Sequence, residues 1–439
     1  MRFYNRTEEI ATLHKIRKHS KENAQFTVVT GRRRIGKTSL VLKAYEDTTL
    51  LYFFVGRKAE NLLCEEFRHE VETKIGIKMG GTPANFAELF EFLMSLSKER
   101  DFTLFIDEFQ NFFRVNPSIF SDMQKIWDLN HDSSKINLIV CGSVYSMMLK
   151  IFRDKKEPLY NRQNRFMHIK AFRPSVLKEI MNDYAPDHSN DDLLALYSFT
   201  GGVAKYVQLL VDDKAFTVDS MIDSIVSADS VFINEGRAIL IEEFGKDYDI
   251  YFSILSAIAS GNTKRTEIES LIGKEIGGYL TRLEDDYGII KKETPLGAKP
   301  LTKNVVYTIH DNFLTFWFRF IFKYGHILEI GAYEQLRFLI KRDYATFSGK
   351  MLERYFYAKA AESGKYTILG RWWNRKGEYE IDLIAANEID KTAEIYEIKR
   401  QRRNINIADL EEKVRAMLPH TNILKDFNLD IRGLDMDNM

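Results

Sequence analysis

The run FTVVTGRRRIGKTSLVLKAY, residues 26–45, restricts the fold of this chain more than any other stretch. Its apolar start predicts a buried strand, and the apolar periodicity of its end predicts a helix. The loop between them fits the pattern GxxxxGK followed by Ser or Thr without a mismatch, through Gly31, Gly36, Lys37 and Thr38. A strand, a glycine-flanked loop and a helix in this order indicate an α/β domain with a parallel sheet and a phosphate-binding P-loop.

The loop also predicts its ligands, which are ATP and Mg²⁺. Glycines let the backbone curl so that its N–H groups and the helix N-terminus face the phosphates. Lys37 would reach the β- and γ-phosphates, and the Thr38 hydroxyl would hold Mg²⁺. The expected nucleotide-binding residues are therefore those of the loop and the start of the helix: Gly31, Arg32, Arg33, Arg34, Ile35, Gly36, Lys37, Thr38 and Ser39.

Two further apolar runs supply polar residues for the same crevice. FTLFIDEFQNFF (102–113) predicts a buried strand that ends in Asp107 and Glu108, where a parallel sheet presents side chains to its ligand. We expect Asp107 to bind Mg²⁺ through water and Glu108 to polarise the water that attacks ATP. KINLIVCGSVYSMM (135–148) predicts a third buried strand that ends in Gly142 and Ser143. Ser143 would sense the γ-phosphate, cap the next helix or do both.

Three segments then resemble the archaeal-type ATPases of the AAA+/STAND superfamily. FYNRTEEI (3–10) is similar to the opening F-x-x-R-x-x-E box of that family. EPLYNRQNRFMHIKAF (157–172) resembles its PLYGR segment, and TGGVAKYV (200–207) resembles its GG-x-P-x-Y lid motif. Together with the P-loop and the strand-end acids, these segments extend the resemblance across the first half of the chain.

The resemblance implies roles for three basic residues. Arg6 would lie near the adenine, and Lys205 would contact the nucleotide from the lid. Arg162 would be an arginine finger or a sensor, because an arginine beside the γ-phosphate stabilises transition-state charge. The sequence departs from the family next to two of these residues, with Asn161 in place of the usual glycine and Ala204 where proline is common.

The middle of the chain predicts helices and one hairpin. Residues 171–240 predict helices, which the family resemblance implies form a lid over the nucleotide. Residues 241–325 predict three short helices and a hairpin, which is the winged-helix plan. Base-specific DNA reading needs a basic third helix, whereas this one is net acidic, so we expect a spacer or scaffold ahead of DNA reading. The hairpin still carries lysines that suit phosphates: Lys291, Lys292, Lys299 and Lys303.

The C-terminal region, residues 326–439, places acids and a lysine in the order of a PD-(D/E)xK nuclease core, with Glu353 on a helix, Asp382 on a strand, and Glu397 and Lys399 on the next strand. Glu353, Asp382 and Glu397 would hold Mg²⁺, which activates water. Lys399 would orient the nucleophile or stabilise charge. The run GRWW…EIDLIA…E-x-K also resembles the DUF234-type domain that accompanies this ATPase family.

A simpler explanation of the same residues stays open, because acids and lysines also pair across half-exposed strands. Asp382 argues against it, since a carboxylate within an apolar strand is costly without a purpose. Two functions follow. In the first, nucleotide state controls a C-terminal nuclease. In the second, the chain is a STAND-type switch whose C-terminal domain binds without cutting. No acid of the metal set is missing, which favours the first.

Composition bounds the remaining expectations. Lys plus Arg and Asp plus Glu both number 63, so overall charge neither indicates nor excludes nucleic acid. The chain has only two cysteines and no CxxC, which suits the cytoplasm and disfavours structural zinc. No apolar run reaches the roughly 18 residues of a membrane span, so no membrane partner is expected. A homo-oligomer and a nucleic-acid partner, DNA in preference to RNA, stay open.

The sequence thus predicts an α/β protein of four parts. These are a P-loop NTPase core with a parallel sheet (1–170), a helical lid (171–240), a winged-helix domain (241–325) and a restriction-endonuclease-like α/β domain (326–439).

Overall fold

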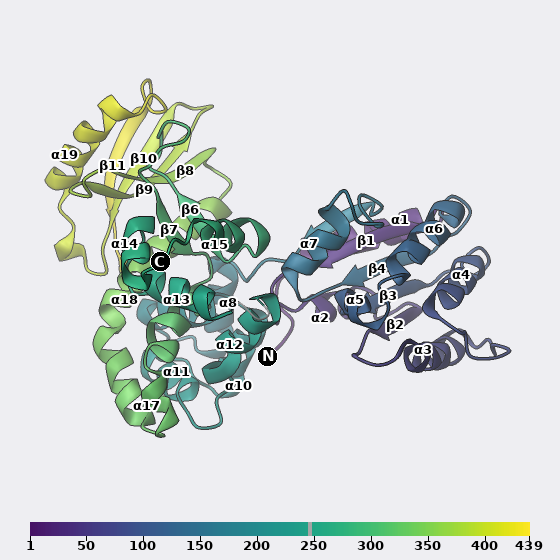
Figure 1. Cartoon of the computed structure of the whole chain (residues 1–439). Helices are drawn as coiled ribbons and strands as arrows, with labels where there is room; N and C mark the ends of the chain where they lie inside the picture. Colours follow the sequence, from purple (N-terminus) through teal and green to yellow (C-terminus); the bar gives the residue numbers. More distant parts are fainter. Residues whose placement is uncertain (245–247) are drawn as a thin grey trace. The chain divides into compact units, whose positions relative to one another are not determined.

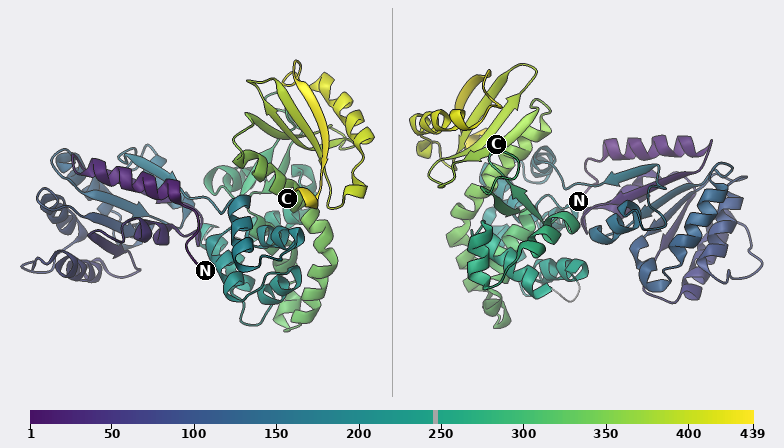
Figure 2. Two further views of the ribbon diagram at one scale, coloured as in Figure 1. Left: turned by 180° about the vertical axis from the view of Figure 1, so that it is seen from behind. Right: turned by 45° about the horizontal axis from the view of Figure 1, so that its top comes forward.

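The chain folds into two compact units in the computed structural model (Figure 1, Figure 2). The structure describes residues 1–244 and 248–439. Residues 5–170 form one unit, and residues 1–4 together with residues 171–439 form the other. Within the described ranges, no helix combines the length and the apolar character that a membrane crossing requires.

The unit of residues 5–170 is built on a five-stranded parallel sheet in the order β2-β3-β4-β1-β5. Its strands are β1 (Gln25–Thr30), β2 (Leu50–Phe54), β3 (Thr103–Asp107), β4 (Asn137–Cys141) and β5 (Arg165–His168). Every residue of β1, β3 and β4 is buried, as expected for central strands covered on both faces. The predicted P-loop type of sheet is confirmed.

Helices connect these strands and bury the core. They are α1 (Thr7–Ser20), α2 (Lys37–Ala44), α3 (Glu60–Ile75), α4 (Phe86–Leu96), α5 (Phe112–Val115), α6 (Ile119–Asn130) and α7 (Tyr145–Arg153). Aromatic side chains fill the interior; the rings of Phe53 and Phe67, for example, stack 4.2 Å apart. Because β4 lies between β1 and β3, the carboxyl ends of these three strands meet at one edge of the sheet.

The second unit begins with helices α8 (Pro174–Tyr184), α9 (Asn190–Thr200), α10 (Ala204–Asp212), α11 (Val218–Ile225) and α12 (Val231–Phe244). Ser189 and Asp192 form a capping box that starts α9, as the sequence predicts. Gly201 and Gly202 end it with positive φ values of 58° and 71°. The chain start joins these helices, since the Met1 amine lies 3.1 Å from Asp212 Oδ1.

Three helices and a hairpin follow, at the places where the sequence predicts them. They are α13 (Tyr248–Ala259), α14 (Arg265–Ile272), α15 (Gly277–Thr281) and the antiparallel strands β6 (Ile290–Glu293) and β7 (Val306–Ile309). The loop of the hairpin contacts the C-terminal sheet: the Leu296 N–H donates to the Arg371 carbonyl at 2.8 Å, and Trp373 Nε1 donates to Asn304 Oδ1 at 3.0 Å. The hairpin is therefore anchored to the C-terminal sheet, and its role as a scaffold ahead of DNA reading stays a prediction.

The C-terminal sheet is mixed, with the order β11-β10-β9-β8. Its elements are α18 (Tyr333–Glu362), β8 (Ile368–Trp373), β9 (Glu380–Asn387), β10 (Thr392–Ile398), α19 (Ile407–Met417) and β11 (Asn428–Leu434). β9 runs antiparallel to both of its neighbours, β8 and β10, whereas β11 is parallel to β10. This is the separate C-terminal α/β sheet that the sequence predicts.

The long helix α18 belongs to both the helical and the sheet portions of this unit. It packs against α9 and α11, and also against β8 and β9, and Figure 2 shows it in green beside both portions. Shorter helices, α16 (Asn312–Phe316) and α17 (Gly325–Glu329), precede it. Because these parts share one compact unit, the boundaries at 240 and 325 stay predictions.

Candidate functional site

The backbone of the phosphate loop is fixed by positive φ angles at Gly31 (144°), Arg34 (65°) and Gly36 (93°). Glycine tolerates this region without strain, and other residues rarely adopt it. At Gly31 there is also no room for a side chain, because a Cβ atom would lie 2.6 Å from the Ile169 carbonyl oxygen. The loop therefore requires glycine here for two independent physical reasons.

Lys37 begins α2 and turns its side chain back into the loop. Its Nζ donates to the carbonyls of Gly31 at 2.8 Å and Arg32 at 2.9 Å, and the side chain is buried. A buried ammonium is favourable only beside acceptors or a counter-charge. The curve of the loop thus concentrates positive charge where phosphate oxygens would be the natural partners.

Thr38 and Asp107 meet across the edge of the sheet, where a magnesium ion would be held. The Thr38 hydroxyl donates to Asp107 Oδ2 at 2.7 Å, and Asp107 is only 5% exposed. Tyr52, which the sequence analysis missed, donates to the same oxygen at 3.2 Å. Burial, together with the Asp107 charge, raises the pKa of Tyr52, so its hydroxyl keeps the proton that it donates. These hard oxygen ligands fit Mg²⁺.

Glu108 sits in a left-handed backbone conformation with φ of 53°, a strained arrangement that concentrates at functional sites. Its backbone N–H donates to Asp107 Oδ1 at 2.9 Å. Its side chain accepts from the Ser143 hydroxyl at 2.8 Å and from the amide of Gln110. The sequence analysis named Glu108 and Ser143 separately but missed Gln110, whose signal is its place two residues after Glu108.

Close packing at Gly142 holds Glu108, Gln110 and Ser143 next to one another. A Cβ atom on Gly142 would lie 2.4 Å from Gln110 Oε1 and 2.4 Å from Met148 Sδ. The turns that follow β3 and β4 therefore touch directly at this glycine. As a result, Glu108, Gln110 and Ser143 form one polar cluster beside the phosphate loop.

Arg6 stabilises the phosphate loop through hydrogen bonds to backbone carbonyls. It is 5% exposed and donates to the carbonyls of Lys170 at 2.7 Å and Ile35 at 3.4 Å, and to Glu9 at 3.1 Å. Ile35 is itself buried within the loop. The guanidinium thus supports the loop through its backbone, whereas the predicted place near the adenine stays a prediction.

The remaining residues predicted to bind the nucleotide are more exposed than Lys37 and Arg6. Arg32, Arg33 and Arg34 are half-buried, and Ser39 is exposed on α2. Lys205 lies in the first turn of α10, exposed, with its Nζ 3.4 Å from Gln208 Oε1. Since Lys205 belongs to the other unit, its role as a lid contact stays a prediction.

Arg162 lies at the amino ends of the strands, away from the phosphate loop. It is paired with Asp128 near the end of α6, with Arg162 Nη2 2.9 Å from Asp128 Oδ2. Three residues further on, β5 begins beside the start of β1, where Asn164 bonds to the Phe26 backbone. The span from Phe26 to Gly31 is about 16 Å of strand at 3.3 Å per residue. Arg162 therefore lies near the opposite end of β1 from its own loop, and its role as an arginine finger or a sensor stays a prediction.

Asn161 adopts the backbone conformation that the usual glycine of the PLYGR-like segment would allow. Its φ is 56°, in the left-handed region that asparagine tolerates better than most residues. The turn that presents Arg162 is therefore kept.

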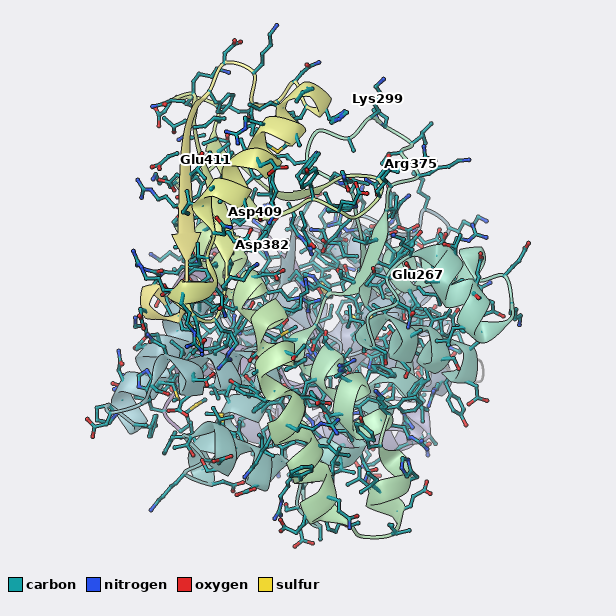
Figure 3. The ribbon with its side chains drawn as sticks, turned by 90° about the vertical axis from the view of Figure 1, so that its left-hand side faces the viewer. Glu267, Lys299, Arg375, Asp382, Asp409 and Glu411 are labelled. Carbon is teal, nitrogen blue, oxygen red and sulfur yellow. The ribbon has the colours of Figure 1, made fainter. Side chains whose placement is uncertain are left out.

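The second site lies in the C-terminal sheet, where three carboxylates converge. Oxygens of Glu353 on α18 and of Glu380 and Asp382 on β9 all lie within 4.8 Å of one another; Figure 3 labels Asp382. Glu380 and Asp382 share a face because they are two residues apart on a strand. Two of the predicted ligands are thus brought together, with Glu380 as a third acid that the sequence analysis missed.

Glu397 lies beside this triad but outside it. It pairs with Lys399 at 2.7 Å and with Lys413 of α19 at 3.1 Å. Lys399 Nζ also lies 3.2 Å from Asp382 Oδ2, and the Ile398 N–H donates to that oxygen at 2.8 Å. Lys399 therefore bridges the triad to Glu397, and the role of Glu397 as a metal ligand stays a prediction.

The triad has the electrostatics of a cation site. Burial raises the pKa of Glu353 to about 7, with Asp382 and Glu380 adding to the effect and Lys350 opposing it. Burial also raises the pKa of Asp382, against the lowering effect of Lys399. At Glu380 the effect of burial is outweighed by the charges of Lys350 and Arg371, which lower its pKa. Buried carboxylates that crowd together favour a cation, and an all-oxygen set suits Mg²⁺ or Mn²⁺.

Comparisons with known proteins agree with this geometry. Residues 3–210 match a family model described as an ATPase domain predominantly from Archaea, and residues 317–412 match the DUF234 model of archaeal and bacterial proteins of unknown function. An uncharacterised protein of Methanocaldococcus jannaschii is 32% identical over 407 residues, which cover 90% of this chain and 87% of the relative.

Solved structures share the fold at low sequence identity. The Walker-type ATPase of Pyrococcus abyssi has a TM-score of 0.55 at 19% identity and covers 72% of this chain and 96% of its own. The ORC2 protein of Aeropyrum pernix, in ADPNP and ADP complexes, has a TM-score of 0.51 at 15% identity, with coverages of 74% and 95%.

The phosphate loop, the acids at the end of β3 and the parallel sheet define a P-loop NTPase fold, which the two solved structures share. More narrowly, the chain belongs to the family of archaeal-type ATPases with a DUF234 domain at the C-terminus.

Proposed function

We propose that this chain binds and hydrolyses ATP with Mg²⁺, and that its nucleotide state is coupled to a C-terminal, magnesium-dependent nuclease-like site acting on nucleic acid. For the first part, the supporting observation is the contact of Thr38 with Asp107 beside Lys37. The converged carboxylates of Glu353, Glu380 and Asp382, with Lys399 beside them, carry the second part.

In the ATPase site each side chain has a definite task. Lys37 and the loop N–H groups bind and orient the phosphates. Thr38 and Asp107 would hold Mg²⁺, which would supply positive charge to neutralise the phosphates. Glu108 orients the attacking water, and its contact with Ser143 links it to the end of β4. Gln110 keeps the Glu108 carboxylate aimed at the crevice.

The placement of Arg162 supports action on a neighbouring subunit. It lies near the amino end of β1, whereas the loop of its own chain follows the carboxyl end. It is partly exposed, and its partners among the described residues are an acid of α6 and a nearby carbonyl. An arginine presented in this way would complete a neighbour's site as a finger. We therefore include a homo-oligomer in the proposal.

At the C-terminal site Mg²⁺ would supply a Lewis acid that activates water and neutralises a phosphodiester. Glu353, Glu380 and Asp382 would hold the ion. Lys399, 3.2 Å from Asp382, would orient the nucleophile or stabilise the charge that develops on phosphate. The order of helix acid, strand acid and strand lysine is that of PD-(D/E)xK nucleases, which supports nucleic acid as the substrate, with DNA ahead of RNA. Both cysteines are free and buried, consistent with a cytoplasmic protein.

A switch that binds without cutting is the second candidate. The observation in its favour is that Lys399 already has two carboxylate partners, Asp382 and Glu397. A lysine neutralised in this way is less free to meet a phosphate than an unpaired one.

The deciding experiment incubates the full chain with ATP, Mg²⁺ or Mn²⁺, and a mixed panel of DNA and RNA. Asp382→Asn should remove cleavage and leave phosphate release from ATP unchanged. Glu108→Gln should stop phosphate release. Cleavage that persists in Asp382→Asn would contradict the nuclease assignment, and ATP-dependent binding without any cleavage would favour the switch.

A further inference from the structure

Arg371 lies next to the carboxylate triad and is held between two acids. It sits at a register shift in β8, between Gly370 and Trp372. One terminal nitrogen of its guanidinium bonds to Glu380 of the triad, and the other lies 3.7 Å from Glu293 Oε2. An irregularity in a strand re-aims a side chain, and here it turns Arg371 towards the acids.

Glu293 is a fixed acceptor rather than a mobile surface acid. It ends β6, and its Oε1 accepts from the Thr308 hydroxyl of β7 at 2.9 Å. The same hairpin is tied to β8 by the Leu296 N–H, which donates to the Arg371 carbonyl at 2.8 Å. The hairpin therefore holds a second carboxylate at a constant place beside the guanidinium.

The present arrangement leaves Arg371 incompletely satisfied. Its Nε is buried and has no acceptor within hydrogen-bond distance among the described residues, although a guanidinium offers five donors. Buried donors without partners are uncommon. A second position of the guanidinium, nearer Glu293, would keep its charge paired while releasing Glu380.

We propose that Arg371 is a resident counter-cation of the triad, that a divalent metal ion must displace it from Glu380, and that Glu293 is the carboxylate that receives it. The inference rests on the C-terminal metal site proposed above. It gives the hairpin a role in that site, because the hairpin sets how easily Arg371 leaves.

The mechanism predicts opposite effects for the two partners. Removing the guanidinium charge takes away the competitor, so metal should bind more tightly. Removing the Glu293 charge removes the acid outside the triad that the described residues place beside Arg371, so Arg371 should stay on Glu380 and metal should bind more weakly. When Arg371 is absent, the loss of Glu293 should have little further effect, because there is no cation to receive.

The test measures Mn²⁺ binding to the full chain by electron paramagnetic resonance, with thermal unfolding to verify folding. Arg371→Gln should tighten binding about tenfold, the equivalent of one charge-assisted hydrogen bond. Glu293→Gln should weaken it several-fold, and the double variant should resemble Arg371→Gln. Arg375→Gln is the matched control, because Arg375 lies in the exposed turn after β8 (Figure 3) and should leave binding unchanged.

Weaker or unchanged binding in Arg371→Gln would overturn the proposal. If that variant does not fold, Arg371→Lys decides, because a lysine keeps the charge but loses the planar fork and should tighten binding by a smaller factor. A wild-type chain that binds no Mn²⁺, or binds it equally well in Asp382→Asn, would instead refute the metal site itself. The two failures are therefore distinguishable.

Discussion

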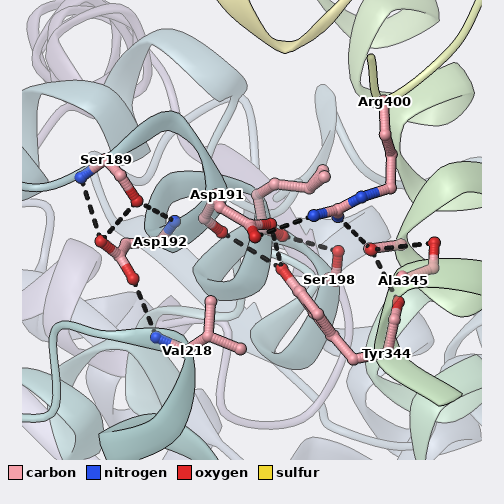
Figure 4. A network of polar contacts seen from close by, with 10 residues as sticks. Ser189, Asp191, Asp192, Ser198, Val218, Tyr344, Ala345 and Arg400 are labelled. Carbon is pink, nitrogen blue, oxygen red and sulfur yellow. Dashed lines mark hydrogen bonds and ion pairs between the residues drawn. The ribbon is translucent and has the colours of Figure 1, made fainter. Parts of the chain in front are cut away.

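The guanidinium of Arg400 donates to Asp191 Oδ2 at 2.8 Å, joining the end of β10 to the start of α9 (Figure 4). Tyr344 of α18 donates to Asp191 Oδ1 at 2.9 Å, and its ring lies 5.3 Å below the Arg400 guanidinium. Arg400 follows Lys399 in the chain, and α9 leads at its other end to the glycines before Lys205. Helix α9 therefore contacts Arg400, the residue after Lys399, at its first turn and leads into the TGGVAKYV segment at its last turn.

Breaking this ion pair should destabilise the second unit. Asp191→Asn or Arg400→Gln should each lower the free energy of unfolding by about 1–2 kcal/mol, the worth of a charge-assisted hydrogen bond in a partly buried place. Denaturant unfolding followed by fluorescence measures the change, and a double-mutant cycle should return a coupling of similar size. Arg403→Gln is the control, since Arg403 is exposed; an equal loss there would argue against a specific pair.

Substitutions in the first site should separate binding from turnover. Lys37→Ala should weaken ATP binding strongly, because it removes the charge that faces the phosphates. Glu108→Gln should keep the affinity and slow phosphate release by about 100-fold or more, as expected for the loss of a group that orients and polarises water. Nucleotide affinity and steady-state phosphate release test both expectations. If phosphate release is unchanged in either variant, the assignment of that residue to the ATPase site is wrong.

Gly31→Ala should damage the loop more than its backbone angle alone explains. The φ of 144° is unfavourable for alanine, and its Cβ would also meet the Ile169 carbonyl at 2.6 Å. We expect a loss of about 2–4 kcal/mol in stability, combining strain with a steric clash. Gly76→Ala is matched to it, because Gly76 has φ of 75° and nothing within 4 Å of a Cβ. If Gly31→Ala and Gly76→Ala lower the free energy of unfolding equally, the contact with the Ile169 carbonyl does not contribute to the loss.

Arg162 should act between subunits. If it completes a neighbour's site, ATPase activity per protomer rises with protein concentration, and mixing Arg162→Ala with Glu108→Gln chains restores part of the activity. Asp128→Asn should free Arg162 and keep that rescue possible, so it separates the ion pair from the finger role. Activity that is independent of concentration, with no rescue on mixing, would leave Arg162 as a structural residue of this chain alone.

Stability should fall with rising pH through the titration of Glu353. Its folded-state pKa of about 7 lies above its ordinary value of 4.5. Between these values the folded chain holds a proton that the unfolded chain has lost, so the free energy of unfolding decreases as the pH rises. Glu353→Gln should flatten this decrease in denaturant unfolding between about pH 5 and 8. If Glu353→Gln shows the same dependence of unfolding free energy on pH as the wild type, the proton is bound by another group.

The P-loop, the acids after β3 and the capped start of α9 were predictable because each is encoded within a few residues. Glu380 could have been predicted too, since it alternates with Asp382 on one strand face. That Glu353 would reach both was foreseeable only from a known order of motifs, because the reach depends on how α18 packs against the sheet.

Other contacts had no local signal. Arg400 is adjacent to Lys399 in a basic run that suits a phosphate backbone, yet its partner Asp191 lies 209 residues away in the chain. Sequence proximity could not have indicated that the Arg400 charge is paired with this acid. The register shift that turns Arg371 inward likewise depends on pairing between β8 and β9, which no single segment specifies.

The anchored hairpin has a consequence for how this molecule behaves at high concentration. β8 is the outermost strand of its sheet, and its free side would offer unpaired backbone groups to any other extended chain. The Leu296 N–H occupies the Arg371 carbonyl, and the Asn304 side chain occupies the Trp373 carbonyl. The hairpin therefore acts as a guard against edge-to-edge association, and a lineage that shortened it would have to protect this strand from aggregation in another way.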